Sequence, residues 1–451
     1  MNLPDILYER LYGQLGADQA DFEAALDTPA PVSIRLNPLK PAPLPTDDPV
    51  PWAAGACYLP ERPRFALDPR WHAGAYYVQE ASSMLVGLAL QQHTNPHRPL
   101  RVLDLCAAPG GKSTHLAALL PPGSLLVANE VIRSRAHILA ENLIKWGHPA
   151  VLVSNNDPRD FQRLPHLFDV LLVDAPCSGE GLIRRDPAAL DEWSPQHLAL
   201  CTDRQRRILL DAWDTLRPGG LLLYSTCTFH PGENADNLRW LAAQVGVSSL
   251  TLDLPAAWGW ETVVGGGITA YQAWPHRVRG EGFFLAVLHK EAGAVQPPRY
   301  PRRPTLATAP RALRDRVADW TDLPADAALL LYGETLLAWP TADIADVDLL
   351  VAQLRIEHLG LPLAEPKQKD LRPHPALALS PLLRQGVFPT QVLDREAVLR
   401  YLRREAPTLD LPDGWGLVQY EGLGLGWVKV MQRRVNNYYP QHWRLRMEIG
   451  L

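Results

Sequence analysis

The most informative run in the chain is Asp169-Val-Leu-Leu-Val-Asp-Ala-Pro-Cys-Ser-Gly-Glu-Gly181. Residues 170–173 are apolar and rich in valine, which predicts a short strand buried on both faces of a sheet. Asp174 follows directly, and a proline and a glycine then turn the chain. Open α/β sheets bind ligands beyond the carboxyl ends of their parallel strands. We therefore expect Asp174 and Cys177 to lie at a ligand site.

A second predicted strand delivers another thiol to the same edge, because it ends in Ser225-Thr-Cys-Thr228. A single cysteine is more often a small buried hydrophobe, and we expect this of Cys57 and Cys201. Two cysteines at neighbouring strand ends, Cys177 and Cys227, instead favour catalysis.

A third run has the order strand, glycine-rich turn and helix. The turn is Cys106-Ala-Ala-Pro-Gly-Gly-Lys112, between a predicted strand at 101–105 and a predicted helix at 113–120. Glycines let backbone amides approach a ligand, and a helix N-terminus favours its negative groups. The turn is neither a Walker loop nor GxGxxG, but it occupies the nucleotide-binding position of a doubly wound sheet.

Strands and helices continue to alternate downstream, which predicts an α/β fold with a mostly parallel sheet between two helical layers. An acid stands in or just past four successive strands: Asp104, Glu130, Asp157 and Asp174. Each alone is more often a helix cap or turn residue. Together they favour a nucleotide-like ligand, since an acid after the second strand usually binds ribose hydroxyls.

The segments on either side of this core differ from it. Residues 1–75 predict a small helical and mixed region, with a strand at Val32-Ser-Ile-Arg-Leu-Asn37 whose Arg35 and Asn37 we expect on an exposed face. A helix is expected over Tyr76–Leu90.

The second half of the chain predicts two further units. A proline- and arginine-rich linker at 296–304 separates a core at 76–292 from a small domain at 305–375. Residues 378–451 predict a compact β module that ends in interleaved aromatics and arginines. Such a surface suits base stacking and phosphate contacts, although aromatics that fill a small β core explain part of the pattern.

Composition narrows the class of protein. The 451 residues are 47% hydrophobic and 21% charged, which predicts a soluble globular protein of two or three domains. No apolar run approaches the roughly twenty residues of a membrane span. The five cysteines form no CxxC pair, so we expect neither a disulfide framework nor a metal site, and a reducing cytoplasm as the location.

The net charge of −5 argues mildly against a nucleic-acid partner, but cations cluster locally. The three clusters are Arg204, Arg206 and Arg207; Arg299, Arg302 and Arg303; and Lys429, Arg433, Arg434, Arg444 and Arg446.

The chain resembles the Nol/Nop/Sun family of RNA cytosine methyltransferases, in its bacterial RsmF-like branch that acts on small-subunit ribosomal RNA. The runs that carry the resemblance are Asp104-Leu-Cys-Ala-Ala-Pro-Gly-Gly-Lys112, Asp174-Ala-Pro-Cys-Ser-Gly-Glu-Gly181, and Ser225-Thr-Cys-Thr228 with Glu233-Asn234. Residues 32–37 resemble the family's N-terminal RNA-binding segment. Residues 424–429 and 436–440 resemble the branch's PUA-like module.

The resemblance implies a Rossmann-like class I methyltransferase core, an N-terminal RNA-binding region and a C-terminal PUA-like module. It implies S-adenosylmethionine as cofactor, and RNA, most closely 16S ribosomal RNA or the small subunit, as partner. Cys227 aligns with the nucleophile and Cys177 with the cysteine that releases product. Glu130 would bind the ribose and Asp157 the adenine amino group. The implied cofactor contacts are Cys106, Ala107, Ala108, Pro109, Gly110, Gly111, Lys112, Glu130, Asp157 and Asp174.

The chemistry agrees with these assignments. Carbon-5 of cytosine is a weak nucleophile, and a thiolate that adds to carbon-6 makes the ring enamine-like. Asp174 is placed to hydrogen-bond the ring nitrogen or amino group, and a base must later remove the carbon-5 proton. The family often has Arg-Lys-Asp where this chain has Arg184-Arg185-Asp186, so Arg185 receives no catalytic role.

Three other functions fit parts of the sequence. An exocyclic-amine methyltransferase would need an Asp/Asn-Pro-Pro-aromatic run, and a DNA cytosine methyltransferase would use the Pro-Cys cysteine. An RNA-binding assembly factor without catalysis would need neither the cofactor loop nor both thiols. Ribosomal and transfer RNA, and free RNA and an assembled subunit, remain open as substrates.

Overall fold

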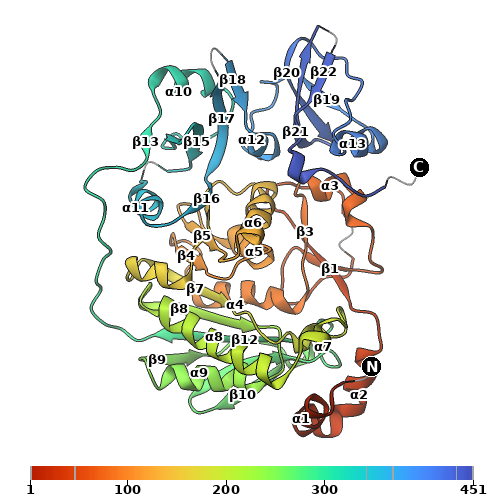
Figure 1. Ribbon diagram of the computed structural model, residues 1–451, viewed down its shortest axis with the longest axis vertical. Helices are drawn as coiled ribbons and strands as arrows, with labels where there is room; N and C mark the ends of the chain where they lie inside the picture. Colours follow the sequence, from red (N-terminus) through yellow and green to blue (C-terminus); the bar gives the residue numbers. More distant parts are fainter. Residues whose placement is uncertain (1–2, 45–46, 342, 368–369, 433, 449–451) are drawn as a thin grey trace.

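A central ten-stranded sheet organises the molecule (Figure 1). The computed structural model describes residues 3–44, 47–341, 343–367, 370–432 and 434–448, so Arg433 of the C-terminal basic cluster lies outside the described residues. The strand order is β10-β11-β12-β8-β7-β4-β5-β6-β16, and β9 pairs with β12. The five central strands are parallel and the flanking ones antiparallel, which confirms the predicted α/β class.

The parallel strands match the predicted ones within a few residues. They are β4 (Arg101–Asp104), β5 (Leu125–Asn129), β6 (Val151–Ser154), β7 (Phe168–Asp174) and β8 (Leu216–Thr226). The antiparallel strands are β9 (Val247–Leu250), β10 (Glu261–Gly265), β11 (Ile268–Ala273), β12 (Phe283–Lys290) and β16 (Ile356–Leu359). Central strands such as β7 are buried almost throughout, because helices cover both faces.

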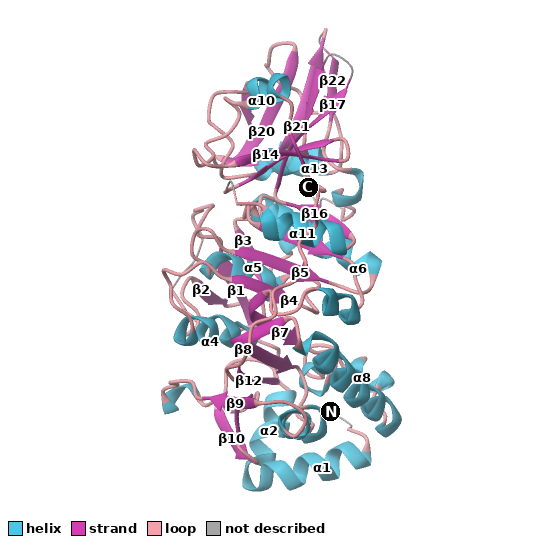
Figure 2. Ribbon diagram, turned by 90° about the vertical axis from the view of Figure 1, so that its left-hand side faces the viewer, coloured by secondary structure: helices cyan, strands magenta, loops and turns pink. Residues whose placement is uncertain are grey.

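Helices form a layer on each face of the sheet (Figure 2). One layer holds α4 (Leu85–His93), α5 (Gly111–Leu119) and α6 (Arg133–Trp146). The other holds α8 (Pro195–Trp213), α9 (Ala235–Ala242) and α11 (Ala345–Gln353). Local signals set the ends of these helices. The Ser194 hydroxyl accepts from His197 N at the start of α8, and Gly147, with φ of 85°, ends α6.

The N-terminal region divides between two places. Helices α1 (Asp5–Leu15) and α2 (Gln19–Leu26) pack at the lower end in Figure 1, near α7 (Ala189–Glu192). A separate sheet of order β2-β1-β3 lies beside the core, with β1 (Val32–Leu36), β2 (Ala56–Leu59) and β3 (Tyr76–Val78). The short helix α3 (Pro69–His72) precedes β3.

Two expectations for this region are wrong. The helix expected over Tyr76–Leu90 begins only at Leu85, because Tyr76–Val78 pairs with β1 instead. Arg35 and Asn37 are buried, at 1% and 2% exposure, and not on an exposed face. Both side chains bond to the core: Arg35 Nε donates to Gln79 Oε1 at 3.0 Å, and Asn37 Nδ2 donates to the carbonyls of Gly74 and Trp146, each at 2.8 Å.

Residues beyond the linker form a five-stranded sheet and also complete the central one. The sheet holds β13 (Ala307–Thr308), β14 (Ala328–Tyr332), β15 (Thr335–Trp339), β17 (Leu361–Lys367) and β18 (Asp370–Pro373), beside α10 (Arg311–Val317). Between β15 and β17 the chain returns to the core, where α11 covers a face and β16 pairs with β6. The edge of the central sheet thus comes from a distant part of the chain.

The C-terminal module is a four-stranded sheet with two helices, at the top of Figure 1. Its elements are α12 (Pro375–Leu379), β19 (Thr390–Val392), α13 (Arg395–Leu402), β20 (Gly414–Tyr420), β21 (Leu423–Met431) and β22 (Arg434–Asn437). Trp427, Tyr439 and Trp443 are buried in its core, so part of the aromatic pattern is structural. Arg70 of α3 binds Glu421 through two nitrogens, at 2.8 and 2.9 Å, and ties the module to the N-terminal region.

Among the described residues, no helix combines the length and apolarity needed to cross a membrane. The same part of the chain contains no cluster of three or more His, Cys, Asp or Glu side chains that could hold a metal ion.

Candidate active site

Two cysteines meet at the carboxyl edge of the sheet. Strands β7 and β8 are parallel neighbours with Asp174 opposite Ser225, so the turns that follow them lie side by side. The Sγ atoms of Cys177 and Cys227 are 3.2 Å apart, and both residues are partly buried. The structure therefore brings together the two thiols that the sequence places at neighbouring strand ends.

A buried carboxylate holds the first cysteine turn in place. Glu233 is fully buried, and its carboxylate accepts hydrogen bonds from Ser178 N at 2.9 Å, Ser178 Oγ at 2.5 Å and Gln205 Nε2 at 2.9 Å. Burial raises the pKa of Glu233, and the hydrogen bonds from Ser178 and Gln205 oppose that shift. The residue after Cys177 is thus fixed by a group 55 positions downstream.

Asn234 and Gly181 hold the second cysteine turn. Asn234 accepts from Thr226 Oγ1 at 2.5 Å and donates to the carbonyl of Thr228 at 2.9 Å, on either side of Cys227. Gly181 N donates to the carbonyl of Cys227 at 2.8 Å, and a Cβ at Gly181 would come 2.8 Å from that oxygen. The same Cβ would come 2.6 Å from the carbonyl oxygen of Gly282, so a side chain at position 181 would displace the Cys227 turn, the Gly282 backbone or both.

Hydrogen bonding keeps Cys177 protonated. The pKa of Cys177 is raised well above its usual value by the hydrogen bond with Cys227 and by burial. A thiol with a raised pKa stays protonated near neutral pH, so the S–H of Cys177 can donate to the Cys227 sulfur.

Asp174 joins the thiols to the glycine-rich turn. Ser225 Oγ donates to one carboxylate oxygen at 2.7 Å, and Lys112 Nζ donates to the other at 2.8 Å. Burial opposes the charged form of Lys112, but the attraction of Asp174 outweighs it and the pKa of Lys112 is raised. Lys112 is therefore a cation that orients Asp174, next to the thiols.

A buried acid, Asp104, binds the start of the helix that follows the glycine-rich turn. Asp104 is 1% exposed and accepts from Ser113 Oγ at 2.6 Å, while its Oδ1 has no hydrogen-bond partner among the described residues. Burial raises the pKa of Asp104 to about 7. Arg135 Nη2 donates to the carbonyl of Ala108 at 2.9 Å, and Gly110 adopts a φ of 113°, which favours glycine.

The two other predicted cofactor acids occupy different surroundings. Glu130 is buried and accepts a hydrogen bond from Ile132 N at 2.9 Å, and its Oε2 lies 3.4 Å from Arg135 Nη1. Asp157 caps a short 3-10 helix by accepting from Arg159 N at 3.2 Å, so the capping interpretation also holds for it.

A cavity of about 500 Å³ joins these groups. Of the predicted site residues, Cys106, Ala108, Glu130, Asp174, Cys177 and Cys227 line it. Ala107, Pro109, Gly110, Gly111, Lys112 and Asp157 lie around it without forming its described wall. Val131, Ile132 and Pro158 give it an apolar side.

Cations line the same cavity. Arg204 and Arg207 of α8 belong to its wall, whereas Arg206 of the same sequence cluster turns away to bind Asn237 at 2.9 Å. The helical period explains this division, since positions 204 and 207 share a face. Sequence reasoning found the cluster but not the two members that face the site.

The sequence is similar to proteins of known families along most of its length. Residues 3–81 match the N-terminal domain of 16S rRNA methyltransferase RsmF, residues 90–289 match 16S rRNA methyltransferase RsmB/F, and residues 389–445 match the methyltransferase RsmF PUA domain. The ribosomal RNA small subunit methyltransferase F of Cronobacter sakazakii is 33% identical over 97% of this chain and 94% of its own. That of Shewanella loihica is 34% identical over 82% and 77%.

A solved structure supports the fold. The methyltransferase homologue from Pyrococcus horikoshii is 27% identical and superposes with a TM-score of 0.54, over 64% of this chain and 96% of its own.

The site fits S-adenosylmethionine. The apolar side formed by Val131, Ile132 and Pro158 suits an adenine ring, and the buried Glu130 suits ribose hydroxyls. The unpartnered Asp104 Oδ1 beneath the turn leaves an acceptor for a further donor.

Proposed function

Because the chain belongs to the family of ribosomal RNA small subunit methyltransferase F, and S-adenosylmethionine is the methyl donor of such enzymes, we propose that it methylates carbon-5 of a cytosine in 16S ribosomal RNA. We place this activity in the cytoplasm. The observation that carries the proposal is the 3.2 Å contact between the Cys177 and Cys227 sulfurs beside Asp174.

Cys227 is the proposed nucleophile. Its sulfur adds to carbon-6 of the cytosine, which makes carbon-5 electron-rich, and the bound cofactor supplies the methyl group there. The S–H of Cys177 supports a thiolate on Cys227, since its raised pKa keeps the proton available for donation. A methyltransferase that acts on an exocyclic amine would need no such nucleophilic thiol.

Asp174 is proposed to orient the cytosine ring. Lys112 and Ser225 fix its carboxylate at 2.8 and 2.7 Å, and the carboxylate lines the cavity beside both thiols. There it can hydrogen-bond the amino group or the protonated ring nitrogen that forms when Cys227 adds.

Cys177 is proposed to take part in product release. After methyl transfer, carbon-5 must lose a proton before the Cys227–carbon-6 bond breaks. The Cys177 sulfur lies 3.2 Å from that of Cys227. Once the Cys227 sulfur is bonded to carbon-6, Cys177 would pass its own proton to water and, as a thiolate, take the carbon-5 proton, while the carbon-6 bond breaks and returns Cys227 as a thiolate.

Cofactor binding is proposed for the glycine-rich turn and the neighbouring acids. Cys106 to Lys112 would approach the cofactor through backbone groups, Glu130 would accept from the ribose, and Asp157 from the adenine amino group. Glu130 and Cys106 line the cavity, which supports the first two assignments.

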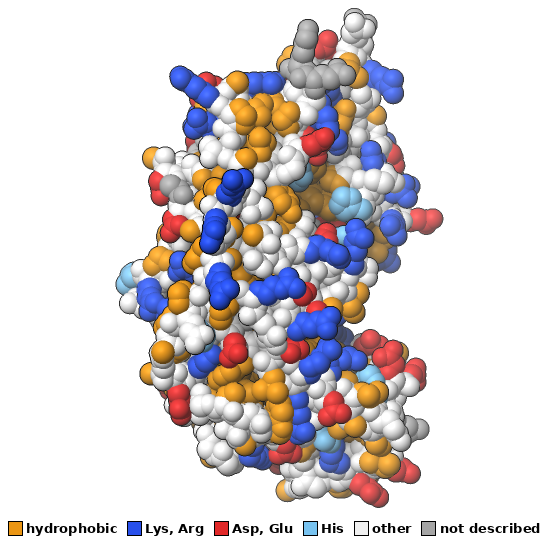
Figure 3. Space-filling view, turned by 60° about the vertical axis from the view of Figure 1, so that its left-hand side comes forward, with side chains coloured by type: hydrophobic (Ala, Val, Ile, Leu, Met, Phe, Trp, Pro, Cys, Tyr) orange, Lys and Arg blue, Asp and Glu red, His pale blue; other side chains and the backbone are white. Residues whose placement is uncertain are grey.

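RNA is the partner that the surface favours. Despite the net charge of −5, Lys and Arg side chains gather across the middle of one face, beside a notch (Figure 3). Arg204 and Arg207 extend this character into the cavity wall, where a phosphate next to the target cytosine would be neutralised.

Bisulfite sequencing of RNA from a strain that lacks the gene tests the proposal. One or more cytosines of 16S ribosomal RNA should lose their methylation and regain it when the gene is restored, but not when the Cys227→Ala variant is supplied. Methylation of naked 16S RNA and of assembled subunits by the purified protein distinguishes the two forms of substrate. Loss confined to transfer RNA, or none, would contradict the proposal.

A further inference from the structure

A second pocket lies beside the glycine-rich turn but apart from the thiols. Its volume is about 240 Å³, less than half of the 500 Å³ cavity. We call it the Trp71 pocket, and the residues that matter to its chemistry are Arg62, Phe65, Trp71, Tyr77, Lys145 and Trp146. It borders the turn, because the Tyr77 hydroxyl donates to the carbonyl of Pro109 at 3.3 Å.

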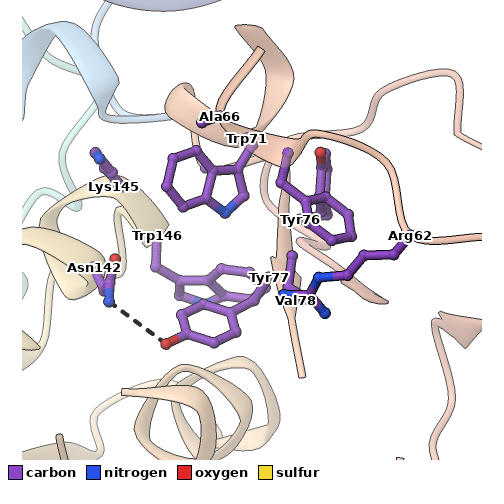
Figure 4. A pocket seen from close by; sticks show the side chains of 11 residues that line it. Arg62, Ala66, Trp71, Tyr76, Tyr77, Val78, Asn142, Lys145 and Trp146 are labelled. Atoms are coloured by element: carbon purple, nitrogen blue, oxygen red, sulfur yellow. Dashed lines mark hydrogen bonds between the residues drawn. The ribbon is translucent and has the colours of Figure 1, made fainter. Parts of the chain in front are cut away.

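Aromatic rings line this space on two sides. Figure 4 shows the ring of Trp71 on one side and those of Trp146 and Tyr77 on the other, with Arg62 and Lys145 towards opposite ends. Rings on opposite sides of an open gap provide two surfaces for a flat π system.

The deep wall is rigid and carries an unused donor. The guanidinium of Arg35 lies 4.4 Å from the Trp146 ring centre and supports that ring from outside the pocket. Trp146 is 1% exposed, and its Nε1 is buried without a hydrogen-bond partner in the described part of the chain.

The charge of the pocket suits a polyanion. Arg62 is exposed at its rim. Lys145 Nζ lies 5.1 Å from the Trp71 ring centre but is paired with Glu141 at 2.5 Å, so a phosphate would meet Arg62. No Asp or Glu is among the described lining residues. Cations beside stacking rings match a nucleotide, whose base stacks while its phosphate binds the cation.

We propose that the Trp71 pocket binds one unpaired nucleobase of the RNA substrate, separate from the target cytosine. The proposal rests on the RNA substrate of the proposed function. The target base must reach Cys227, in the other cavity, so the Trp71 pocket holds a different base of the same RNA. Its contact with Pro109 places that base next to the cofactor turn.

Photocrosslinking tests the proposal directly. The probe is 16S ribosomal RNA transcribed with thiouridine or, in a second preparation, with thioguanosine, bound to the full-length protein. Irradiation should yield a crosslinked peptide from residues 62–78 or 142–146. Crosslinks that map only elsewhere, from both probes, would overturn the proposal.

Variants of the pocket residues test whether the pocket contributes to RNA affinity. Loss of one stacked base weakens binding roughly five- to one-hundred-fold, so Trp71→Ala should raise the RNA dissociation constant by that factor. Arg62→Ala, an exposed change that the fold tolerates, should raise it several-fold, while Arg64→Ala is the matched control because Arg64 is exposed nearby but outside the pocket. Unchanged RNA affinity in Arg62→Ala and Trp71→Ala, both with wild-type melting, would overturn the proposal.

The readouts separate this inference from the proposed function. Cofactor affinity and the Cys227 adduct at saturating RNA should stay normal in the Arg62 variant, with the change confined to the RNA concentration needed. A wild-type protein that forms no methylcytosine would defeat the proposed function. A methylating wild type whose pocket variants bind and crosslink like Arg64→Ala would defeat only this inference.

Discussion

The sulfur of Cys177 lies 3.2 Å from the sulfur of Cys227, at the ends of two adjacent parallel strands. At this distance, removal of both protons would bring two negative sulfurs into contact, so the pair holds at least one proton in its resting state. The hydrogen bond with Cys227 and burial both raise the pKa of Cys177. Different groups hold the two thiol turns, since Glu233 binds the residue after Cys177 and Asn234 binds the residues on either side of Cys227.

The first prediction separates the roles of Cys227 and Cys177. Cys227→Ala should form no covalent adduct with RNA and should be inactive, while it still binds RNA. Cys177→Ala should attack and methylate but stall before release, which leaves a protein–RNA adduct that survives denaturing electrophoresis and depends on S-adenosylmethionine.

The double variant should show no adduct, because attack precedes release. One gel with labelled RNA compares all three proteins. An active Cys177→Ala enzyme without adduct would mean that Cys177 only packs, and an adduct in the Cys227→Ala lane would reverse the assignment.

A second prediction concerns the cofactor acids. Glu130→Ala and Asp157→Ala should each weaken S-adenosylmethionine binding by about 1.5–3 kcal/mol, the usual loss for a hydrogen bond to a charged group. Calorimetry measures this, with RNA affinity as the control. Asp157→Asn keeps a capping oxygen for Arg159 N, so it separates the cap from a cofactor contact. Unchanged cofactor affinity in both alanine variants would remove these acids from the site.

The third prediction is a pH dependence of stability that arises from Asp104. Burial raises its pKa to about 7 from 3.8, so between these values the folded protein holds a proton that the unfolded chain releases. Stability contributed by this group is complete below about pH 4 and is lost as the pH rises through about 7. Over that window the loss amounts to roughly 4 kcal/mol, at about 1.4 kcal/mol per pH unit.

Asp104→Asn cannot titrate and provides the comparison. Urea unfolding without cofactor, at several pH values across the window, should show the wild type losing stability relative to the variant as the pH rises. Two parallel profiles would show that Asp104 does not carry the effect.

A fourth prediction concerns Arg35, whose segment resembles an RNA-binding element but whose side chain is buried. Its guanidinium donates to Gln79 Oε1 at 3.0 Å and to Thr114 Oγ1 at 2.6 Å, and burial lowers its pKa to about 9. Arg35→Met should cost about 2–3 kcal/mol of stability by leaving buried acceptors unsatisfied. Denaturant unfolding measures this loss. RNA affinity of the folded variant should keep its salt dependence, and a flattened dependence would return Arg35 to the RNA surface.

The fifth prediction tests the C-terminal module without removing it, since truncation near Ala378 would open its core. Trp415 and Tyr438 form a partly exposed edge-to-face pair, with Lys429 5.0 Å from the Trp415 ring centre and Arg372 5.3 Å from that of Tyr438. Lys429→Ala and Arg372→Ala should each weaken RNA binding and lower its salt slope by about 0.7–0.9.

Arg311→Ala is the matched control for these two variants, because Arg311 is 87% exposed on α10. Binding measured at several salt concentrations compares them. Equal slopes for all three variants and the wild type would assign the module another role.

Much of the core could be predicted from sequence because its signals are local. The valine-rich β7, the glycine-rich turn and the two cysteine motifs each lie within about ten consecutive residues, and parallel pairing alone brings the motifs to one edge. Burial of Cys57 and Cys201 is also confirmed.

The remaining features depend on partners that are distant in the chain. Arg35 is buried because Gln79, Thr114 and Trp146 surround it, 44 to 111 residues downstream, and no local pattern encodes this. Tyr76–Val78 has strand-forming residues, but its apolar spacing also suits a helix, and only the presence of β1 decides between them. Glu233, whose carboxylate holds the Cys177 turn, is also distant in the chain from the residue that it binds, and only the family resemblance pointed to it.

The position of β16 affects how the protein can be made. Residues 356–359 close the edge of the sheet beside β6, so that edge stays unpaired on the ribosome until some two hundred further residues have followed residue 154. An open edge strand can pair with other chains, which makes this interval of synthesis the most prone to aggregation. Expression of the first 292 residues alone would fix the nascent chain in that exposed state.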